Sequence, residues 1–568
     1  MQRSWIPLAW LALATGCGPP GPGGRPSPPG AGGPFDVIIE GGRIVDGTGN
    51  PWFPADVGIR ADRIAAVTPP GMLADAEARH RIDATGRVVA PGFIDIQSHS
   101  RFNFLGSEDG RVVSKVTMGV TTEIMGESTT NAPSSPAMLE AAGEAAGVTQ
   151  FETFDQWIDA MEEHGASVNF GSFVGASTIR VLGMGEAMGP AGSPELRLMQ
   201  QAVRESMEHG AFGIGSALIY PPGSFASTEE LISINRAAAP YGGVYITHMR
   251  SEADNYLEAI DEAIEIGTGA GVPVEIFHLK AGGQRNWNKA ALAIAKIDSA
   301  RAVGVDIQAN MYPYTAGSTG LTACFPPWAS ADGKLFENLA DPLMRDRIRQ
   351  EIENQTEEWE NLCDLATPEG TLLLGFDRPQ NRGFVGRYLS DVAQELGQDW
   401  IETAFDLVLS ERQRVGTIYF MMSEENVALQ IAQPWIKFGT DAGGIDPEAA
   451  TGLAHPRAYG TFARVLGKYV REEGTTTLEE AVRKMSSAVA TRLRIVDRGL
   501  LVEGFYADVV VFDPESVADH ATYEEPHQVS SGIEHVLVSG VAVVSDGDHT
   551  GALPGRPVRG PGWTGWRR

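Results

Sequence analysis

A short apolar run that turns polar at its end reads Pro91-Gly92-Phe93-Ile94-Asp95-Ile96-Gln97-Ser98-His99. Such a run is typical of a buried parallel strand, and similar runs recur along the chain. Helical patterns lie between them, for example Tyr256–Ile266 and Asn288–Ala302. The predicted strands are Gly92–Gln97, Val120–Met125, Val168–Gly175, Ala211–Ala217, Val244–Thr247, Val274–Phe277, Val305–Ala309 and Ile436–Gly439. Strands and helices that alternate in this way predict an α/β fold, a (β/α)8 TIM barrel.

Both flanks of this region are β-rich. The candidate strands are Asp36–Glu40, Gly42–Asp46, Asp56–Ile59, Arg63–Val67, Ala507–Phe512, His535–Val538 and Val541–Ser545. They predict one small β-sandwich made from residues 35–90 and 497–550, around a barrel over residues 91–496. The long gap between the seventh and eighth strands predicts an inserted subdomain, about residues 325–425, that covers the barrel mouth. Residues 551–568 are expected to form a C-terminal tail.

The N-terminus has the pattern of a bacterial export signal. One basic residue, Arg3, precedes an apolar run that is too short to span a bilayer. Ala14-Thr15-Gly16-Cys17 resembles a lipoprotein cleavage site, which predicts a signal peptide over residues 1–17 and a lipid on Cys17. An ordinary secretory signal is the alternative. Residues 18–34 are almost entirely Gly and Pro, which predicts a tether. We therefore expect a periplasmic or cell-envelope lipoprotein, held to the membrane only through Cys17.

Charge and cysteine content limit the partners and leave one question open. The formal net charge of −29 argues against a nucleic-acid partner and against docking on an anionic membrane. Cys324 and Cys363 are not spaced like a zinc knuckle or a redox pair. They either form one disulfide or remain two separate buried thiols. The sequence does not predict an oligomeric state.

Polar side chains follow most of the predicted barrel strands. They are His99, Glu127, Ser128, His248, His278, Tyr312 and Asp441. The C-terminal ends of barrel strands share one face, so these residues are expected to converge. A single histidine is more often a structural residue, but three histidines and two carboxylates at strand ends indicate a metal site. Imidazole and carboxylate together suit zinc.

Several motifs resemble the amidohydrolase superfamily, and within it the D-aminoacylase (N-acyl-D-amino-acid deacylase) family. The first is the opening run Pro91–His99. The others are Thr247-His248-Met249-Arg250-Ser251-Glu252, Phe277-His278-Leu279-Lys280, Met311–Thr319, Gly439-Thr440-Asp441-Ala442, His455–Phe462, Arg498–Leu501 and Gly504–Val509. The resemblance runs from about Phe35 to Asp513. It implies a metal-dependent enzyme that hydrolyses the amide of small N-acyl amino acids, and the expected D preference comes from it alone.

Two positions depart from the family pattern. Gln97 stands where the superfamily usually has the first histidine of His-x-His. Gly126-Glu127-Ser128 stands where the family usually has a metal-binding cysteine. Glu127 is expected to replace the thiolate as a ligand, or else to position a helix or a water. We expect one tightly bound zinc on His248, His278 and Glu127, with a second, weak site possible at His99.

The resemblance also implies roles around the metal. Asp441 is the expected general base and acid, with a helix N-cap as the alternative. The substrate carboxylate is expected to meet Arg457, Lys280, Tyr312 and Ser318, where a surface salt bridge or loop packing are the alternatives. Two other functions stay open at this point. One is a dihydroorotase-like or hydantoinase-like cyclic amide hydrolase, and the other is an inactive binding lipoprotein, which Gln97 and Ser128 would suit.

Overall fold

The computed structural model describes residues 33–106, 110–144, 149–354 and 358–567. The export signal, Cys17 and nearly all of the tether lie outside the described residues. Within those ranges no helix combines the length and the apolar character that crossing a bilayer requires.

Parallel strands form the central barrel and confirm the predicted α/β fold. In chain order they are β6 (Phe93–Asp95), β7 (Val120–Met125), β8 (Asn169–Ser172), β9 (Val174–Gly175), β10 (Gly213–Ala217), β11 (Val244–His248), β12 (Val274–Ile276), β13 (Ile307–Met311) and β17 (Ile436–Phe438). Each predicted strand is present, but the third is interrupted at Phe173. Its first half, β8, pairs with β7, whereas its second half, β9, pairs with β10.

The first and last barrel strands meet just beyond their ends. The backbone NH of Asp441 donates to the Gln97 carbonyl at 2.8 Å, and that of His99 donates to the Ala442 carbonyl at 3.1 Å. A buried ion pair reinforces this junction, because Lys115 Nζ lies 2.8 Å from Asp95 Oδ2 and 2.6 Å from Thr440 Oγ1. The junction therefore places His99 and Asp441 side by side.

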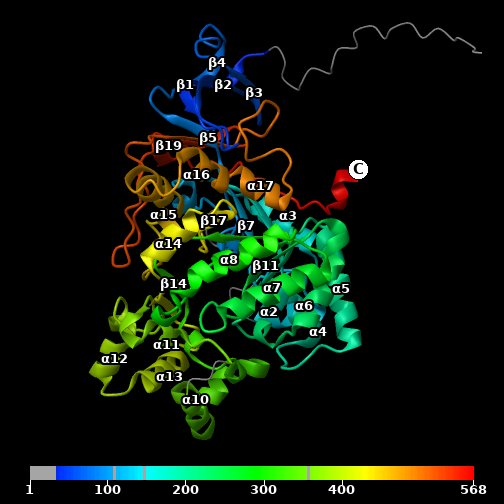
Figure 1. Ribbon diagram of the computed structural model, residues 1–568, viewed down its shortest axis with the longest axis vertical. Helices are drawn as coiled ribbons and strands as arrows, with labels where there is room; N and C mark the ends of the chain where they lie inside the picture. Colours follow the sequence, from blue (N-terminus) through cyan, green and yellow to red (C-terminus); the bar gives the residue numbers. More distant parts are fainter. Residues whose placement is uncertain (1–32, 107–109, 145–148, 355–357, 568) are drawn as a thin grey trace, which may run out of the picture. The chain divides into compact units, whose positions relative to one another are not determined.

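Helices surround the barrel strands (Figure 1). They are α1 (Val113–Val116), α2 (Pro136–Glu144), α3 (Phe154–His164), α4 (Ala176–Met184), α5 (Ser193–Glu208), α6 (Thr228–Ala238), α7 (Tyr256–Ala270), α8 (Lys289–Ala302), α14 (Glu424–Ile431), α15 (Arg457–Arg464), α16 (Leu478–Met485) and α17 (Ser487–Leu493). The start of α3 is fixed by a capping box, in which the Thr153 side chain and the Gln156 side chain each accept from the other's backbone NH.

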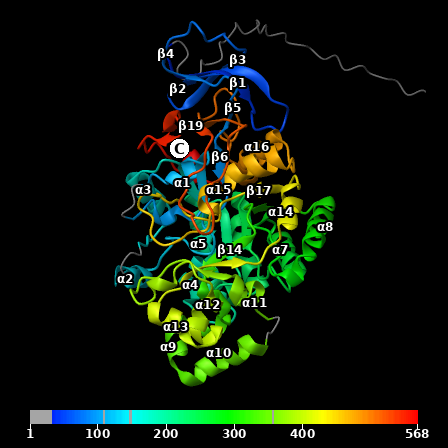
Figure 2. The same ribbon diagram turned by 90° about the vertical axis from the view of Figure 1, so that its left-hand side faces the viewer.

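The segment between β13 and β17 forms the predicted subdomain. It contains a three-stranded antiparallel sheet in the order β14, β16, β15, and a group of helices with their own apolar core. The strands are β14 (Ala316–Gly320), β15 (Thr371–Leu373) and β16 (Gly416–Phe420), and the helices are α9 (Leu335–Ala340), α10 (Pro342–Asn354), α11 (Leu362–Ala366), α12 (Leu389–Leu396) and α13 (Trp400–Glu411). Figure 2 shows β14 between the barrel strands and α9, α10, α12 and α13. The subdomain thus starts at Ala316, before the expected residue 325.

The two remaining cysteines are joined. Cys324 and Cys363 form a disulfide within the inserted subdomain, with a Cα–Cα distance of 5.2 Å. Of the two alternatives that the sequence left open, the structure has the disulfide.

Strands from both ends of the chain share one nine-stranded sheet, which forms the predicted β-sandwich. Its order is β21, β20, β19, β18, β5, β1, β2, β3, with β4 paired to β1. The bounds are β1 (Phe35–Ile44), β2 (Phe53–Arg60), β3 (Arg63–Thr68), β4 (Ala78–Asp83), β5 (Val88–Pro91), β18 (Val509–Phe512), β19 (Ile533–Val538), β20 (Val541–Ser545) and β21 (Asp548–His549). The two predicted strands at residues 36–46 are a single strand with a register shift between Ile39 and Gly42.

The last residues of the chain pack against the barrel. Gly555 NH donates to the Ala166 carbonyl at 2.8 Å, Val558 NH to the Phe170 carbonyl at 2.7 Å, and Gly560 NH to the Gly210 carbonyl at 2.7 Å. The expected C-terminal tail is therefore a segment that runs past the N-terminal ends of β8 and β10.

Candidate metal centre and active site

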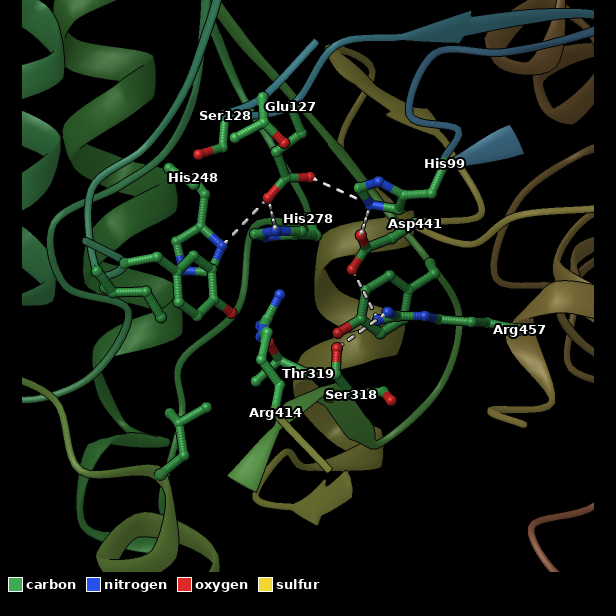
Figure 3. Close-up of a pocket in the computed structure, with 18 of the residues that line it drawn as sticks. His99, Glu127, Ser128, His248, His278, Ser318, Thr319, Arg414, Asp441 and Arg457 are labelled. Carbon is green, nitrogen blue, oxygen red and sulfur yellow. Dashed lines mark hydrogen bonds and ion pairs between the residues drawn. The ribbon is translucent and has the colours of Figure 1, made fainter. Parts of the chain in front are cut away.

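The polar residues at the strand ends converge on one pocket of about 510 Å³. Figure 3 shows their side chains facing one another across it. The pocket is lined by His99, Glu127, His248, His278, Lys280, Tyr312, Ser318, Asp441 and Arg457, among others. Every residue that the sequence proposed for the site therefore lies at the same pocket.

A tight turn after β7 brings Glu127 into the pocket. Gly126 has a φ of +105°, and a Cβ at this position would lie 2.3 Å from the Phe173 carbonyl oxygen. Only glycine fits both the backbone angle and the close approach. Ser128, the next position in the turn, directs its Oγ to Ser177 Oγ at 2.9 Å. Glu127, which lies one position before the family's cysteine, therefore faces the pocket. Ser128, at the position of that cysteine, instead contacts Ser177.

Glu127, His248 and His278 form a compact group of donor atoms. Glu127 Oε1 lies 3.5 Å from His248 Nδ1 and 3.5 Å from His278 Nε2. Zinc–ligand distances of about 2.0–2.1 Å in a tetrahedron place ligand atoms about 3.3–3.4 Å apart. Both distances are close to this value, and the ligand atoms of the three residues all lie within 4.8 Å of one another, as a shared zinc ion requires.

Glu252 faces the other side of both imidazoles. Its Oε1 lies 2.9 Å from His278 Nδ1, and its Oε2 lies 3.5 Å from His248 Nε2. A carboxylate behind a metal-binding histidine fixes the ring and its tautomer. Glu252 also accepts from Lys280 Nζ through both oxygens, at 2.8 and 2.7 Å. Lys280 is thus engaged with Glu252 at the edge of the pocket.

A second donor group shares Glu127 with the first. His99, Glu127 and Asp441 each offer an atom within 4.8 Å of the others. His99 Nε2 lies 2.9 Å from Asp441 Oδ1 and 3.6 Å from Glu127 Oε2. Gln97 Nε2 donates to the same Glu127 oxygen at 2.6 Å. The residue that replaces the first superfamily histidine therefore orients the shared carboxylate.

Burial and opposite charges shift the pKa values of these groups. Burial raises the pKa of Glu127, but hydrogen bonds from His248 and His278 outweigh it and hold the pKa well below its usual range. Burial and Lys280 lower the pKa of His278, whereas Glu252, Asp441 and Glu127 raise it, with a net value of about 9. Metal binding requires the neutral imidazole, so a metal ion and a proton compete for His278.

Asp441 pairs with Arg457 on the side away from His99. Arg457 Nη1 lies 2.7 Å from Asp441 Oδ2, and Arg457 Nη2 donates to the Ser318 carbonyl at 3.3 Å. Burial raises the pKa of Asp441, but Arg457, His278 and the hydrogen bond to His99 lower it overall. Asp441 also has a φ of +51°, a strained value for a residue other than glycine. It does not cap a helix, because α15 begins at Arg457 with Pro456 as its N-cap.

Tyr312 and Ser318 both contact Arg457. The guanidinium carbon of Arg457 is 4.6 Å from the centre of the Tyr312 ring. Ser318 Oγ donates to the Thr417 carbonyl at 3.0 Å, so its hydroxyl holds β14 to β16.

Several residues of the site were not assigned from the sequence. They are Gln97, Tyr220, Glu252 and Arg414, together with Lys115 beneath the site. Glu252 could have been predicted from the sequence, since it lies in the same motif as His248 and four residues after it. The sequence did not predict that Arg414 belongs to the site, because this residue lies in the inserted subdomain and outside every motif.

Comparisons with known proteins show the family to which the chain belongs. A family model described as "Amidohydrolase family" matches residues 385–544. A D-aminoacylase of Alcaligenes xylosoxydans xylosoxydans is 37% identical over 528 residues, which are 92% of this chain and 97% of that protein. The chain belongs to the D-aminoacylase family of amidohydrolases. The resemblance seen in the sequence motifs is thereby confirmed.

Two solved structures of this family match the whole barrel and sandwich. A crystal structure of D-aminoacylase superposes with a TM-score of 0.76 at 35% identity, over 93% of this chain and all of the other. An N-acyl-D-glutamate deacylase from Bordetella bronchiseptica, complexed with zinc and a phosphonate inhibitor that mimics the tetrahedral intermediate, has a TM-score of 0.76 at 33% identity. It covers 93% of this chain and all of its own.

Proposed function

We propose that this chain is a zinc-dependent hydrolase that cleaves the amide bond of N-acyl-D-amino acids to give a carboxylic acid and a free amino acid. One observation carries the proposal: Glu127, His248 and His278 have the spacing of a zinc site within the same pocket as the buried carboxylate of Asp441. The family relationship to a D-aminoacylase supports the substrate class.

His248, His278 and Glu127 would hold the zinc ion, and Glu252 would fix the two imidazoles from behind. Bound there, zinc supplies Lewis-acid chemistry that polarises a carbonyl and lowers the pKa of water to about 7. His99 would take part in a second, weaker site with Glu127 and Asp441.

Asp441 moves the proton in this proposal. Its Oδ1 accepts the proton of the attacking water and then delivers it to the departing nitrogen. Arg457 holds the other oxygen, Oδ2, at 2.7 Å, which fixes the direction of Oδ1. His99 Nε2 lies 2.9 Å from Oδ1 and would donate to the developing oxyanion when it holds no second metal.

The substrate α-carboxylate is assigned to Arg457, with Lys280, Tyr312 and Ser318 around it. Arginine offers a carboxylate two parallel donors, which makes it suited to this task. Arg457 contacts Asp441 and Lys280 contacts Glu252. A substrate carboxylate would therefore bind to donors of Arg457 that these contacts leave open.

One experiment tests both roles. Release of the free amine is measured for an N-acyl amino acid and for a matched amide that lacks the α-carboxylate. Asp441→Asn should lower kcat on both substrates by about 10²–10⁴-fold at unchanged zinc content. Arg457→Lys should lower kcat/KM by about ten- to a hundredfold more on the first substrate than on the second, because lysine keeps a charge near Asp441 but loses the fork that binds the α-carboxylate.

Two results would contradict the proposed roles. Equal losses on both substrates in Arg457→Lys would mean that Arg457 serves Asp441 alone. Zinc-loaded wild type that releases no amino acid from any D- or L-compound would contradict the hydrolase and favour the binding protein.

We also propose that the chain is exported and lipidated at Cys17. The N-terminal sequence supports this, and the disulfide between Cys324 and Cys363 fits an oxidising compartment. Labelled palmitate should enter wild type in a bacterial host and not Cys17→Ala. Equal labelling of both proteins, or of neither, would refute the anchor.

A further inference from the structure

Four cationic side chains line the pocket, and they differ in how they are neutralised. They are Arg101, Lys280, Arg414 and Arg457. Lys280 is paired with Glu252 and Arg457 with Asp441. Arg101 donates to the Thr129 carbonyl at 2.8 Å. Within the described part of the chain, neither Arg101 nor Arg414 has a carboxylate partner.

Arg414 reaches into the pocket from the inserted subdomain. It precedes β16, and its Nη2 donates to Thr319 Oγ1 at 2.5 Å. Its guanidinium carbon lies 5.4 Å from the centre of the Tyr220 ring, which in turn lies 5.4 Å from the His248 ring. Figure 3 shows Arg414 pointing toward the space in front of His248 and His278. Its side chain is exposed to the pocket and open to a ligand.

The backbone next to Arg414 is strained and firmly held. Val415 has a φ of +53°, which is rare for a β-branched residue. Its side chain is 2% exposed within the core of the subdomain, and its carbonyl accepts from Leu321 NH at 2.8 Å. Strain of this kind persists only where the surroundings enforce it, and it concentrates at functional sites. Buried contacts of Val415 therefore set the direction of Arg414.

We propose that Arg414 binds a second carboxylate of the substrate, so that the enzyme prefers N-acyl amino acids with two carboxylates. The inference rests on the proposed function, in which Arg457 takes the α-carboxylate. An unpaired guanidinium in the pocket of a protein with net charge −29 attracts an anion locally, and its fork matches a carboxylate. The second carboxylate belongs either to an acidic side chain or to a dicarboxylic acyl group.

The test compares two pairs of substrates that differ by one charge. N-acetylglutamate is compared with N-acetylglutamine, and N-succinylmethionine with N-acetylmethionine, in the configuration that wild type hydrolyses. Arg414→Met removes the charge and keeps most of the length. The matched control is Arg412→Met, because Arg412 lies two residues away, rests on the Phe336 ring at 4.9 Å and does not line the pocket.

Arg414→Met should lower kcat/KM for a dicarboxylate by about ten- to a hundredfold and leave that of its monocarboxylate partner near the wild-type value. A loss confined to N-acetylglutamate assigns the carboxylate to the side chain, and a loss confined to N-succinylmethionine assigns it to the acyl group. Arg412→Met should match wild type on all four. Equal losses on all four substrates in Arg414→Met, or no loss on either dicarboxylate, would overturn the proposal.

Equilibrium binding separates this inference from the proposed function. Calorimetry on zinc-loaded Asp441→Asn, with and without Arg414→Met, measures the affinity for N-acetylglutamate and N-acetylglutamine without turnover. A preference for the dicarboxylate that depends on Arg414 supports the inference even if no substrate is hydrolysed. Hydrolysis of monocarboxylate substrates without any such preference would support the hydrolase and exclude the proposed role of Arg414.

Discussion

Glu127 is the residue on which both donor groups depend. One oxygen faces His248 and His278, and the other faces His99 and Gln97. The family places a thiolate close by, and the carboxylate supplies the same negative charge with two donor atoms in place of one. Loss of this charge leaves two neutral imidazoles as the ligands of a divalent ion.

Zinc retention should follow the charge at position 127. Glu127→Gln should lose zinc on dialysis against a weak chelator, because an amide is a poor ligand and the site becomes more positive. Glu127→Cys should restore binding, since a thiolate returns the anion. Elemental analysis gives the stoichiometry, with Ser128→Ala as the control, whose hydroxyl contacts Ser177 outside the metal group. Firm zinc binding in Glu127→Gln would reduce Glu127 to an orienting role.

The sequence predicted which residues meet in the pocket better than it predicted their contacts. Strand-end position was enough for His99, His248, His278 and Asp441, since the barrel brings strand ends together. Lys280 was assigned to the substrate, and its ammonium group contacts Glu252. Such a contact depends on side-chain direction, which strand spacing does not determine.

At the scale of elements, the inserted subdomain supplies one wall of the pocket. Its strand β14 pairs with β16, so that Ser318 lies opposite Ile418. The sequence predicted the subdomain from the long gap before the last strand, but it missed β14, whose residues Ala-Gly-Ser-Thr-Gly have little strand character. Its partner is far away in the chain, and no local pattern reveals such a pairing.

The disulfide should stabilise this subdomain. Cys324 and Cys363 are separated by 39 residues, so the bond restricts a long loop of the unfolded chain. Replacing both by alanine should lower the free energy of unfolding by about 2–4 kcal/mol, measured by urea denaturation. A reductant should shift the wild-type midpoint and leave that of the double variant unchanged. A wild-type midpoint that is insensitive to reductant would contradict this.

At the scale of the whole molecule, alternation of strands and helices was enough to predict the barrel, and β-rich ends were enough to predict the sandwich. The features that the sequence did not predict are pairings between strands that lie far apart in the chain. The strand β4 is polar and mostly exposed, and it pairs with β1 only through the folded sheet. The interruption at Phe173 divides the third barrel strand between two neighbours, which a continuous apolar run does not show.

The shared sheet has a consequence for how the protein is made. β5 pairs with β18, and Asp508, just before β18, accepts from Asn169 Nδ2 at 3.2 Å. A nascent chain leaves the ribosome N-terminus first, so β5 waits with an open edge until almost the entire polypeptide has been synthesised. Unpaired edges and distant pairings favour slow folding and aggregation. A polypeptide truncated before Val509 therefore lacks the partner of β5 altogether, and the open edge of β5 is left to pair with other chains.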